Sequence, residues 1–459
     1  MKFTRRRFLK TVAGVSGAAL LRPTRLGALA ESRSLERRAV GLPRPDKSGV
    51  ENVVVVMMEN RSFDHFLGWH PNADGMQGGL TYLDAGGVPH QTHALAPDYL
   101  GCGHADPDHS WEGGRIQFNK GAMDGFLRSG DNDEYSIGYY RESDRPFYSA
   151  LARNYTVLDR YFCSILGPTF PNRFFLHAAQ TDRLTNTLVL ATMPTIWDRL
   201  AEANVSRRYY FSNLPFVALW GERYDGISQP YAQFLMDAQS GQLPAVSFLD
   251  PTFTLSDDGT GNDDHPHADI RRGDAFLAEV FHAVATGPQW PNTVFIVNYD
   301  EWGGFFDHVP PPRAAAPNPV DPDLEDGKAR LGFRVPTVVA SPFARGNPAD
   351  PRVNSGVFDH TSVLKLIEWR WGLKPLTARD ASDDIANLAS VLDLENPQTQ
   401  LADLPLPEAP APQACPGVPR TANDGSQEGQ AQTKRLVRPG ESDWAKLARS
   451  SLLEGWSLR

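Results

Sequence analysis

Two runs of apolar residues, 53–58 and 294–299, differ from the mixed polar and apolar pattern around them. Both lack the alternation that a strand with one solvent-facing side shows, and most of their side chains are β-branched or otherwise strongly apolar. They are typical of strands that are buried on both faces of a parallel sheet. Each run leads directly into acidic and polar residues, and open α/β sheets bind ligands at the carboxyl ends of their strands. The pattern therefore predicts two core strands whose ends share a functional site.

Shorter apolar runs predict further strands, and apolar residues at helical spacing predict the helices between them. Three more strands are expected, at 208–211, 245–249 and 335–340. Helices are expected at 147–161, 172–179, 195–203 (with Thr195 as N-cap), 270–285 and 361–371. Strands that alternate with helices predict an α/β fold, a three-layer sandwich around a mostly parallel central sheet.

Two other parts of the chain lack this pattern. Residues 68–144 are rich in Gly, Asp and His with little periodicity, which is typical of a functional surface or of a loop packed over a site. The composition changes after Leu394, where a proline-rich stretch at 404–419 predicts an extended linker. An amphipathic helix is expected at 444–456, docked on the body or lying on a membrane. We therefore expect one globular domain at 31–395 and a C-terminal linker and helix at 396–459.

Residues 1–30 have the features of a targeting segment. Arg5 and Arg6 stand in a basic group before Phe-Leu-Lys, a mild apolar stretch follows, and small residues at 28–30 resemble a cleavage site. This order is that of a twin-arginine signal peptide, whose cargo is handed to the twin-arginine export machinery after folding. The apolar stretch is too short, and too rich in Gly, Ala and Ser, for a membrane span. We expect export to the periplasm, the cell surface or the medium.

Composition and charge narrow the class of partner. Of the 459 residues 41% are hydrophobic and 22% are charged, which is ordinary for a globular protein. Residues 1–30 carry seven Lys and Arg residues and no acid, so the remaining chain has 38 basic and 55 acidic residues and a net charge of −17. This balance argues against a nucleic-acid partner and against tight adhesion to anionic lipid. A zwitterionic substrate stays compatible with it.

The chain has three cysteines, Cys102, Cys163 and Cys415. Export to an oxidising compartment permits one disulfide. Because Cys415 lies in the proline-rich segment, Cys102 and Cys163 are the expected pair.

Acidic and amide side chains follow both core strands. Glu59 and Asn60 come after the first, and Asp300 and Glu301 after the second. Carboxylates that meet at one sheet edge repel each other unless a cation neutralises them, and carboxylate and amide oxygens are ligands for hard cations. The sequence therefore predicts a metal site between the two junctions. Asn60 and Ser62 also have the residue types of a helix N-cap before Phe63, and one turn can serve both purposes.

Several histidines stand beside acids in segments expected to be loops. A carboxylate orients and charges an imidazole for contact with a phosphate or a leaving group. A single histidine in a loop is more often solvated, but this repetition favours a site. The histidines are His104, His109, His265, His267, His308 and His360.

Thr169 lies between two prolines, before the helix expected at 172–179. This position puts its hydroxyl near a helix N-terminus, which favours anions. Taken alone, Thr169 is a turn residue. Beside a cation and several histidines it becomes a candidate nucleophile that metal coordination activates.

Four segments in this order resemble the bacterial phosphoesterase superfamily that contains the phosphatidylcholine-type phospholipases C and the acid phosphatases. They are 57–65, Gly-Pro-Thr-Phe-Pro-Asn-Arg at 167–173, 264–267 and 299–312. The resemblance implies an alkaline-phosphatase-like α/β sandwich with the catalytic domain at 31–395. It also implies one or more divalent metal ions, whether calcium, zinc, magnesium or manganese.

The resemblance also assigns roles to single residues. It implies a metal bound by Glu59, Asn60, Thr169, Asp300 and Glu301. Thr169 would attack phosphorus and form a phospho-threonine intermediate that water hydrolyses. Histidines would stabilise the equatorial oxygens and protonate the leaving alkoxide. The first candidates for this role are His109, His265 and His267, and the second candidates, which could instead brace the metal ligands, are His308 and His360.

The expected function is that of an exported metal-dependent phosphoesterase. Threonine in the 167–173 motif resembles the phospholipase C branch, which cleaves phosphodiesters such as phosphatidylcholine. An acid phosphatase that acts on phosphomonoesters and a catalytically silent secreted binding protein are the alternatives. A sulfatase or phosphonate hydrolase would need a modified cysteine or another nucleophile in the first helix, and no cysteine lies near that segment. Lipid head groups would be met by loops of the catalytic domain, such as the one with Tyr135, Tyr139 and Tyr140, although these tyrosines are equally compatible with packing.

Overall fold

The computed structural model describes residues 42–253 and 259–415. All helices and strands named below belong to one compact unit that begins at Arg44. The predicted signal peptide at 1–30 and the helix expected at 444–456 lie outside the described residues. No helix in the described ranges is long and apolar enough to cross a membrane.

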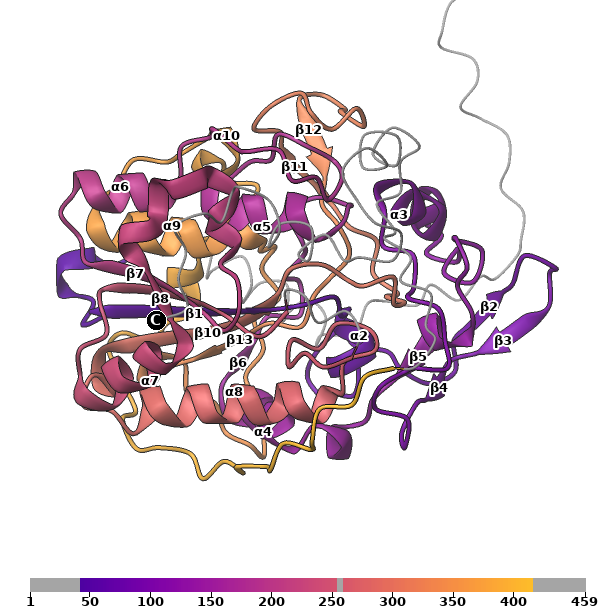
Figure 1. The fold of residues 1–459 in the computed structure, drawn as a ribbon, viewed down its shortest axis with the longest axis horizontal. Helices are drawn as coiled ribbons and strands as arrows, with labels where there is room; N and C mark the ends of the chain where they lie inside the picture. The colour runs from indigo at the N-terminus through magenta and orange to yellow at the C-terminus, as the bar shows by residue number, and fades with distance from the viewer. Residues whose placement is uncertain (1–41, 254–258, 416–459) are drawn as a thin grey trace, which may run out of the picture. The chain divides into compact units, whose positions relative to one another are not determined.

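A seven-stranded sheet forms the centre of this unit (Figure 1). The strand order is β6-β13-β10-β1-β9-β7-β8, and β13 alone runs antiparallel to its neighbours within this sheet. The strands are β1 Asn52–Met58, β6 Thr156–Val157, β7 Arg207–Phe211, β8 Ser228–Pro230, β9 Val246–Asp250, β10 Thr293–Tyr299 and β13 Val338–Ala340. The mostly parallel α/β sheet predicted from the apolar runs is confirmed.

Helices cover both faces of the sheet, which makes the three layers of a sandwich (Figure 1). One face carries α5 Thr169–Ala178, α6 Ile196–Glu202, α9 His360–Trp371 and α10 Ala378–Ala381. The other face carries α4 Pro146–Asn154, α7 Tyr231–Ser240 and α8 Ile270–Ala285. The prediction of a three-layer arrangement is therefore confirmed.

Smaller elements surround the sandwich. The additional helices are α2 Phe63–Leu67 and α3 Trp111–Phe118, and the additional strands pair as β2 Thr81–Leu83 with β3 Pro89–Gln91, β4 His93–Ala94 with β5 Gly138–Tyr139, and β11 Arg313–Ala315 with β12 Lys328–Arg330. Short 3₁₀ helices occur at Pro45–Lys47, Asn119–Gly121, Glu134–Ile137, Glu142–Asp144, Phe216–Ile227, Trp290–Asn292, Pro342–Ala344 and Leu388–Val391.

The two core strands lie side by side. β1 pairs in parallel with β10, with Asn52 opposite Thr293 and Met58 opposite Tyr299. Every residue of both strands is buried, as their continuous apolar sequence predicted. Because the register is exact to the last pair, the residues that follow the two strands leave the sheet at the same level.

Two predicted helices have different bounds in the structure from those expected. The helix expected at 147–161 is wrong beyond Asn154, because Thr156–Val157 forms edge strand β6 and pairs with β13. The helix expected at 172–179 begins earlier, at Thr169. Pro171 fits in the first turn of α5 because a helix needs no N–H donor there. Thr169 is therefore a helical residue and not part of a preceding turn.

The other predicted elements agree more closely. The helix at 270–285 is α8, and the remaining helices and strands differ by one residue at most at either end, except the strand expected at 335–340. Only Val338–Ala340 of that segment is a strand, and it is antiparallel. Pro336 lacks the N–H that a ladder needs, which explains the shorter strand. His360 was expected in a loop but is the first residue of α9, where Asp359 caps the helix.

The irregular stretch at 68–144 contains α3 and short strand pairs, and its tyrosines mostly serve packing. Tyr135 and Tyr140 are 0% and 1% exposed. Tyr140 Oη donates to Asp98 O at 2.8 Å, and the Tyr135 ring packs edge-on against Phe305. The suggestion that these two tyrosines contact lipid is therefore wrong, while Tyr139 is partly exposed.

The disulfide predicted between Cys102 and Cys163 is also wrong. Cys102 is bonded to Cys415, and Cys163 is a buried free thiol. The prediction assumed that the proline-rich segment leaves the body of the protein. Instead the described part of the segment, up to Cys415, lies against the body, where Arg272 Nη1 donates to Pro410 O at 2.8 Å. This docking brings Cys415 to the loop that holds Cys102.

Peptide mapping under non-reducing conditions should find the tryptic fragment with Cys102 linked to the fragment with Cys415. Cys163 should resist iodoacetamide until denaturant is added, because its side chain is fully buried. A fragment that links Cys102 to Cys163 would contradict this topology.

Candidate active site

The two strand-to-acid junctions meet at one edge of the sheet. Asn60 N donates to Asp300 Oδ1 at 3.0 Å, and Arg61 N donates to Glu301 O at 3.0 Å. Glu59, Asn60, Asp300 and Glu301 are all at most 5% exposed. Parallel strands in register thus place four polar side chains from two distant segments in one buried group.

Thr169 lies against the first of these junctions. Its Oγ1 is 3.5 Å from Glu59 Oε1 and 3.3 Å from Asn60 Oδ1, and the residue is 3% exposed. Thr169 is the first residue of α5, so the helix fixes its backbone. The structure therefore brings the candidate nucleophile together with the oxygen atoms of the first predicted ligand pair.

The backbone at this junction is tightly packed and partly strained. Asn60 has φ 59°, in the left-handed region that non-glycine residues rarely adopt. Gly303 has φ 63°, and a Cβ there would lie 2.0 Å from Asn60 O. Only glycine allows the loop after β10 to approach Asn60 this closely. Such strain is typical of functional sites, where the surrounding fold enforces it.

Arg173 holds the Asp300 carboxylate in place. Arg173 Nε donates to Asp300 Oδ2 at 2.9 Å, and its Nη1 donates to Asp250 Oδ1 at 3.1 Å. Burial opposes the charge of Arg173, but Asp300 and Asp250 outweigh it and raise the pKa of the guanidinium. Asp300 Oδ1 accepts from the N–H groups of Asn60 and Glu301. Asp300 therefore organises both junctions and has few lone pairs left for a cation.

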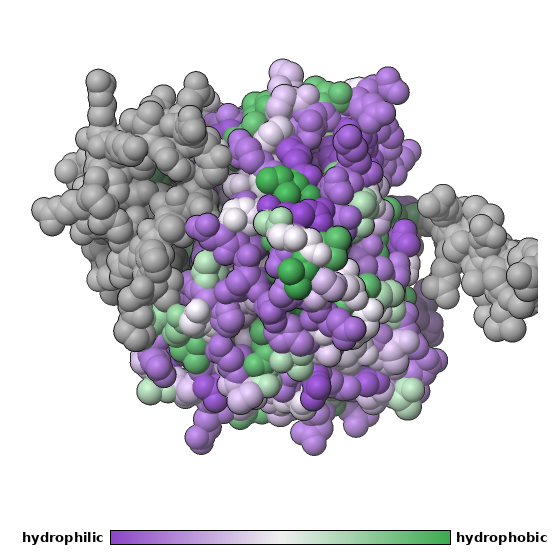
Figure 2. Space-filling view, turned by 90° about the vertical axis from the view of Figure 1, so that its right-hand side faces the viewer, coloured by the Kyte–Doolittle hydropathy of each residue, from purple (hydrophilic) through white to green (hydrophobic). Residues whose placement is uncertain are grey.

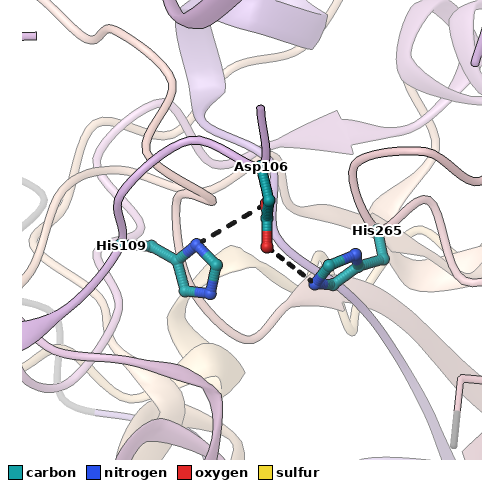
Figure 3. A group of neighbouring side chains, drawn as sticks. All are labelled: Asp106, His109 and His265. Carbon is teal, nitrogen blue, oxygen red and sulfur yellow. Dashed lines mark ion pairs between the residues drawn. The ribbon is translucent and has the colours of Figure 1, made fainter. Parts of the chain in front are cut away.

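A second group consists of Asp106, His109 and His265 (Figure 3). His109 Nδ1 lies 4.0 Å from Asp106 Oδ1, and His265 Nε2 lies 3.9 Å from Asp106 Oδ2. His109 Nε2 lies 3.8 Å from Glu301 Oε1. The histidines were predicted site residues, but Asp106 was not. Its position two residues after His104, in the same acidic loop, was the signal available in the sequence.

The electrostatics of this group are set by burial and by the carboxylates. Burial alone would lower the pKa of His109, but Glu301 and Asp106 raise it to about 9. Burial raises the pKa of Glu301, although the facing His109 opposes this shift. Burial lowers the pKa of His265, and Asp106 counteracts only part of that effect. The buried carboxylates of this group thus favour positive charge on His109 or close beside it.

His267 points to a different partner. Its Nε2 donates to His104 O at 3.0 Å, and its backbone has φ 80°. Cys415 Sγ lies 3.6 Å from His267 O. The ring therefore fastens the 263–267 loop to the loop that carries Cys102 and Asp106. Of the three histidines expected first, the structure places His109 and His265 around one point and anchors His267 beside them.

Arg61 fastens the same loop to the end of β1. Arg61 Nε donates to Asp264 O at 2.6 Å, and its Nη1 lies 2.9 Å from His65 Nε2. The Asp264 carboxylate accepts from Tyr299 Oη at 2.6 Å and from Arg145 Nη2 at 2.7 Å. Sequence reasoning missed Arg61 and Asp264 as positioning residues, although both lie inside the quoted motifs.

His360 braces the peptide of Asp300. Its Nε2 donates to Asp300 O at 2.7 Å, and its Nδ1 lies 3.3 Å from Tyr161 Oη. The residue is 0% exposed. Both ring nitrogens are engaged, so the structure supports the bracing alternative for His360 over direct contact with substrate.

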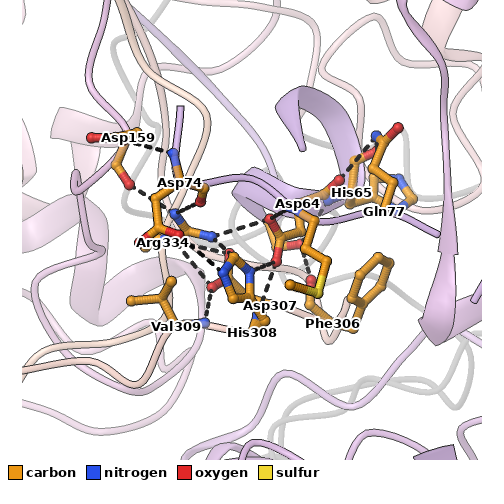
Figure 4. A network of polar contacts seen from close by, with 12 residues as sticks. Asp64, His65, Asp74, Gln77, Asp159, Phe306, Asp307, His308, Val309 and Arg334 are labelled. Carbon is orange, nitrogen blue, oxygen red and sulfur yellow. Dashed lines mark hydrogen bonds and ion pairs between the residues drawn. The ribbon is translucent and has the colours of Figure 1, made fainter. Parts of the chain in front are cut away.

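His308 belongs to a separate cluster (Figure 4). Its Nδ1 lies 2.5 Å from Asp64 Oδ2, and its Nε2 lies 3.2 Å from Asp74 Oδ1. Arg334 bridges this cluster, since Nη2 lies 3.1 Å from Asp64 Oδ1 and Nε lies 3.0 Å from Asp307 Oδ1. Asp64, Asp307 and His308 have the residue types of a metal site. Arg334 already supplies the positive charge there, so this cluster is a structural ion network.

A mostly parallel α/β sheet that gathers carboxylates, histidines and a helix-borne hydroxyl at its strand ends has the residue types of a hydrolytic active site. A model of the Phosphoesterase family matches residues 50–374. The chain belongs to this family.

Relatives from plants and bacteria match most of the chain. Non-specific phospholipase C1 of Arabidopsis thaliana is 32% identical over 390 residues, which cover 77% of this chain and 73% of the relative. Phospholipase C A of Mycobacterium tuberculosis is 30% identical over 439 residues, which cover 81% of each chain.

Solved structures are more distant. The phosphonate monoester hydrolase of Agrobacterium radiobacter is 12% identical, with a TM-score of 0.36 and coverage of 75% of this chain and 77% of its own. A protein in the alkaline phosphatase superfamily from Vibrio parahaemolyticus is 10% identical, with a TM-score of 0.35 and coverage of 76% of this chain and 74% of its own.

Proposed function

We propose that the protein is an exported, metal-dependent phosphoesterase of the phospholipase C type that cleaves phosphodiesters such as phosphatidylcholine. The observation that carries this proposal is the buried Thr169 hydroxyl, 3.3 and 3.5 Å from the side-chain oxygens of Asn60 and Glu59. The relatives named phospholipase C, at 30–32% identity over most of the chain, favour a phosphodiester over a phosphomonoester. The pair Arg5 and Arg6 supports export by the twin-arginine route.

The residues around Thr169 fit a hard divalent cation. Glu59, Asn60 and Thr169 direct oxygen atoms toward one another, and Asp300 and Glu301 follow the neighbouring strand. Glu301 Oε1 is buried and accepts no hydrogen bond from the described residues. Carboxylate, amide and hydroxyl oxygens suit calcium, magnesium, manganese or zinc. A bound cation would neutralise the carboxylates and lower the pKa of the Thr169 hydroxyl.

Thr169 then acts as the nucleophile in this proposal. Its Oγ1 forms a bond to phosphorus while the bond from phosphorus to the leaving alkoxide breaks, which leaves phospho-threonine. The leaving alkoxide takes up the proton that the Thr169 hydroxyl gives up and departs as the alcohol, which for phosphatidylcholine is diacylglycerol. Water then attacks the phosphoryl group, releases the phosphorylated head group and restores the Thr169 hydroxyl. This chemistry depends mainly on positioning and on positive charge around the phosphoryl oxygens.

The start of α5 contributes little of that positive charge through hydrogen bonds. Phe170 N already donates to Asn186 Oδ1 at 2.8 Å, and Pro171 has no N–H. The expectation that this helix terminus binds the anion directly is therefore weakened. The positive charge around the phosphoryl oxygens would instead come from the cation and from the part of the site that contains His109 and His265.

Loops of the catalytic domain remain the proposed contact with lipid. Val189 and Leu190 are 63% and 43% exposed and follow Asn186, which contacts the start of α5. Figure 2 shows a face on which polar residues predominate and apolar residues gather in small groups. Shallow contact of a few apolar side chains with a zwitterionic surface agrees with the acidic net charge of the chain.

Initial rates on p-nitrophenylphosphorylcholine, p-nitrophenyl phosphate and a phosphatidylcholine dispersion test this function. We expect the diester to be cleaved at least about 10-fold faster than the monoester, because the family relatives are phospholipases. Dialysis against EDTA should lower the rate by at least about 10²-fold, and a divalent cation should restore it, since the metal activates the nucleophile. A monoester preference would indicate an acid phosphatase. Inactivity on every phosphoester would support the binding-protein alternative.

A further inference from the structure

His109 and His265 present their rings in the same way. His109 Nδ1 lies 2.7 Å from Pro107 O, and His265 Nδ1 lies 2.8 Å from Pro266 O. A carbonyl oxygen only accepts hydrogen bonds, so each Nδ1 carries a proton, and Nε2 is the ring nitrogen that can offer its lone pair to a ligand. Imidazoles that bind metals are usually oriented by such a bond from the other ring nitrogen.

Both Nε2 atoms face carboxylate oxygens at distances that exceed a hydrogen bond. The His109 Nε2 to Glu301 Oε1 distance is 3.8 Å, and the His265 Nε2 to Asp106 Oδ2 distance is 3.9 Å. A direct charge-assisted bond would be about 2.7–2.9 Å long. Two atoms that bind the same cation, each about 2.0–2.2 Å from it, lie farther apart than the donor and acceptor atoms of a hydrogen bond. One ligand atom from each of Asp106, His109 and His265 lies within 4.8 Å of the others.

Two buried carboxylate oxygens in this group have no hydrogen-bond partner in the described part of the chain. They are Glu301 Oε1, on a residue that is 0% exposed, and Asp106 Oδ1. Leaving such oxygens unmatched is costly in a buried site. The ion pairs of Asp106 are with the two imidazoles, at 3.9 and 4.0 Å.

The His308 cluster shows how histidine and aspartate side chains pack when a side chain of the protein neutralises the carboxylates. There His308 Nδ1 lies 2.5 Å from Asp64 Oδ2. The Arg334 guanidinium neutralises Asp64 and Asp307. The group around Asp106 keeps wider spacings and has unmatched oxygens. The two clusters thus differ in one respect: a positively charged side chain, Arg334, pairs with the carboxylates of the His308 cluster, whereas the Asp106 group keeps carboxylate oxygens without a hydrogen-bond partner among the described residues.

We propose that Asp106, His109 and His265 bind a second divalent cation, distinct from the one held by the Glu59 and Asn60 side, with Glu301 Oε1 facing it. Two imidazole nitrogens beside carboxylates favour zinc, cobalt or manganese over calcium and magnesium. This inference rests on the proposed function, because it names the source of the positive charge on the histidine side of the site. It makes His109 and His265 ligands rather than proton donors.

Metal stoichiometry of the full chain tests the proposal. The protein is stripped with chelator, dialysed against ZnCl₂ in metal-free buffer, freed of excess ion and analysed by mass spectrometry of the elements. We expect about two equivalents of zinc in the wild type and about one in His265→Gln, since two ligands alone hold zinc weakly. Cobalt substitution gives a second measurement, in which the visible absorption of the imidazole-bound ion should be lost in His265→Gln.

His90→Gln is the matched control. His90 also stands between two carboxylates, with Nε2 3.2 Å from Asp84 and Nδ1 2.8 Å from Glu134, but on the surface and at hydrogen-bond distance. It should keep both equivalents of zinc. If His265→Gln does not fold, the zinc content of Asp106→Asn is measured in its place. The melting temperature of the wild type is also measured with and without zinc, and zinc should raise it.

The outcomes separate this inference from the proposed function. One equivalent of zinc in the wild type, or two in a folded His265→Gln, would overturn the second site. A wild type that cleaves the diester with a single bound ion would leave the function intact and reject the inference. A wild type that binds two ions but cleaves no phosphoester would reject the function and keep the second site.

Discussion

Thr169→Ala is expected to lower kcat on p-nitrophenylphosphorylcholine by at least about 10³-fold. The substitution removes the hydroxyl that lies 3.5 Å from Glu59 Oε1 and 3.3 Å from Asn60 Oδ1. Alanine has no side-chain oxygen that could form the bond to phosphorus. Steady-state rates measure the loss, and acid quenching of the wild type during turnover should trap a phosphoryl group on the peptide that contains Thr169.

Two variants accompany this experiment. Thr169→Ser keeps the hydroxyl and should retain most of the activity. Thr156→Ala removes another buried threonine hydroxyl, which donates to Ala344 O at 2.9 Å on edge strand β6, and should leave kcat within about 3-fold of the wild type. A Thr169→Ala protein that binds its metal, keeps its circular dichroism spectrum and still cleaves the substrate would reject the nucleophile assignment.

Arg334→Met is expected to lower the free energy of unfolding by about 3–5 kcal/mol. The Arg334 side chain is 0% exposed and neutralises Asp64 and Asp307, which are equally buried (Figure 4). Its Nη1 also donates to Asp159 O at 2.9 Å. Methionine has a similar length but no charge, so two buried aspartates would lose their counter-ion. Denaturant unfolding followed by circular dichroism measures the change.

Arg160→Met is the control for that experiment. Arg160 also pairs with an aspartate, Asp74 at 3.2 Å, but both side chains are 43% exposed. An exposed pair contributes about 1 kcal/mol or less, so this variant should remain close to the wild type. Equal stability of both variants would show that the Arg334 cluster does not hold the fold together. It would then reopen a direct metal-binding role for Asp64, Asp307 and His308.

Much of the fold could be predicted because its causes are local. A strand that is buried on both faces must be apolar at every position, so β1 and β10 were visible as continuous runs. Parallel strands end at one edge of a sheet, so the meeting of Glu59 and Asn60 with Asp300 and Glu301 followed from that pattern. Element boundaries were less certain where a single residue decides them. Pro336 shortened one strand, and β6 ended the predicted helix at 147–161.

The partners of the charged residues could not be predicted in the same way. Arg61, Arg173 and Arg334 are fully or almost fully buried, although arginine is usually exposed. Each is paired with groups from distant segments, such as Arg173 with Asp250 and Asp300. Nothing in the neighbouring residues specifies such a pairing. The same holds for His308, which stands in a motif beside the site but is bound into the Arg334 cluster.

By itself the sequence determined the α/β class and the two strand-to-acid junctions, and the family resemblance of its motifs pointed to Thr169 as the hydroxyl between them. The class and the junctions depend on periodicity and on strand and helix ends, which neighbouring residues control. Only the tertiary structure decided that Cys415 pairs with Cys102, that Asp106 joins His109 and His265, and that His360 braces Asp300. Those contacts join segments far apart in the chain, so they depend on how the loops and the proline-rich segment pack around the sheet.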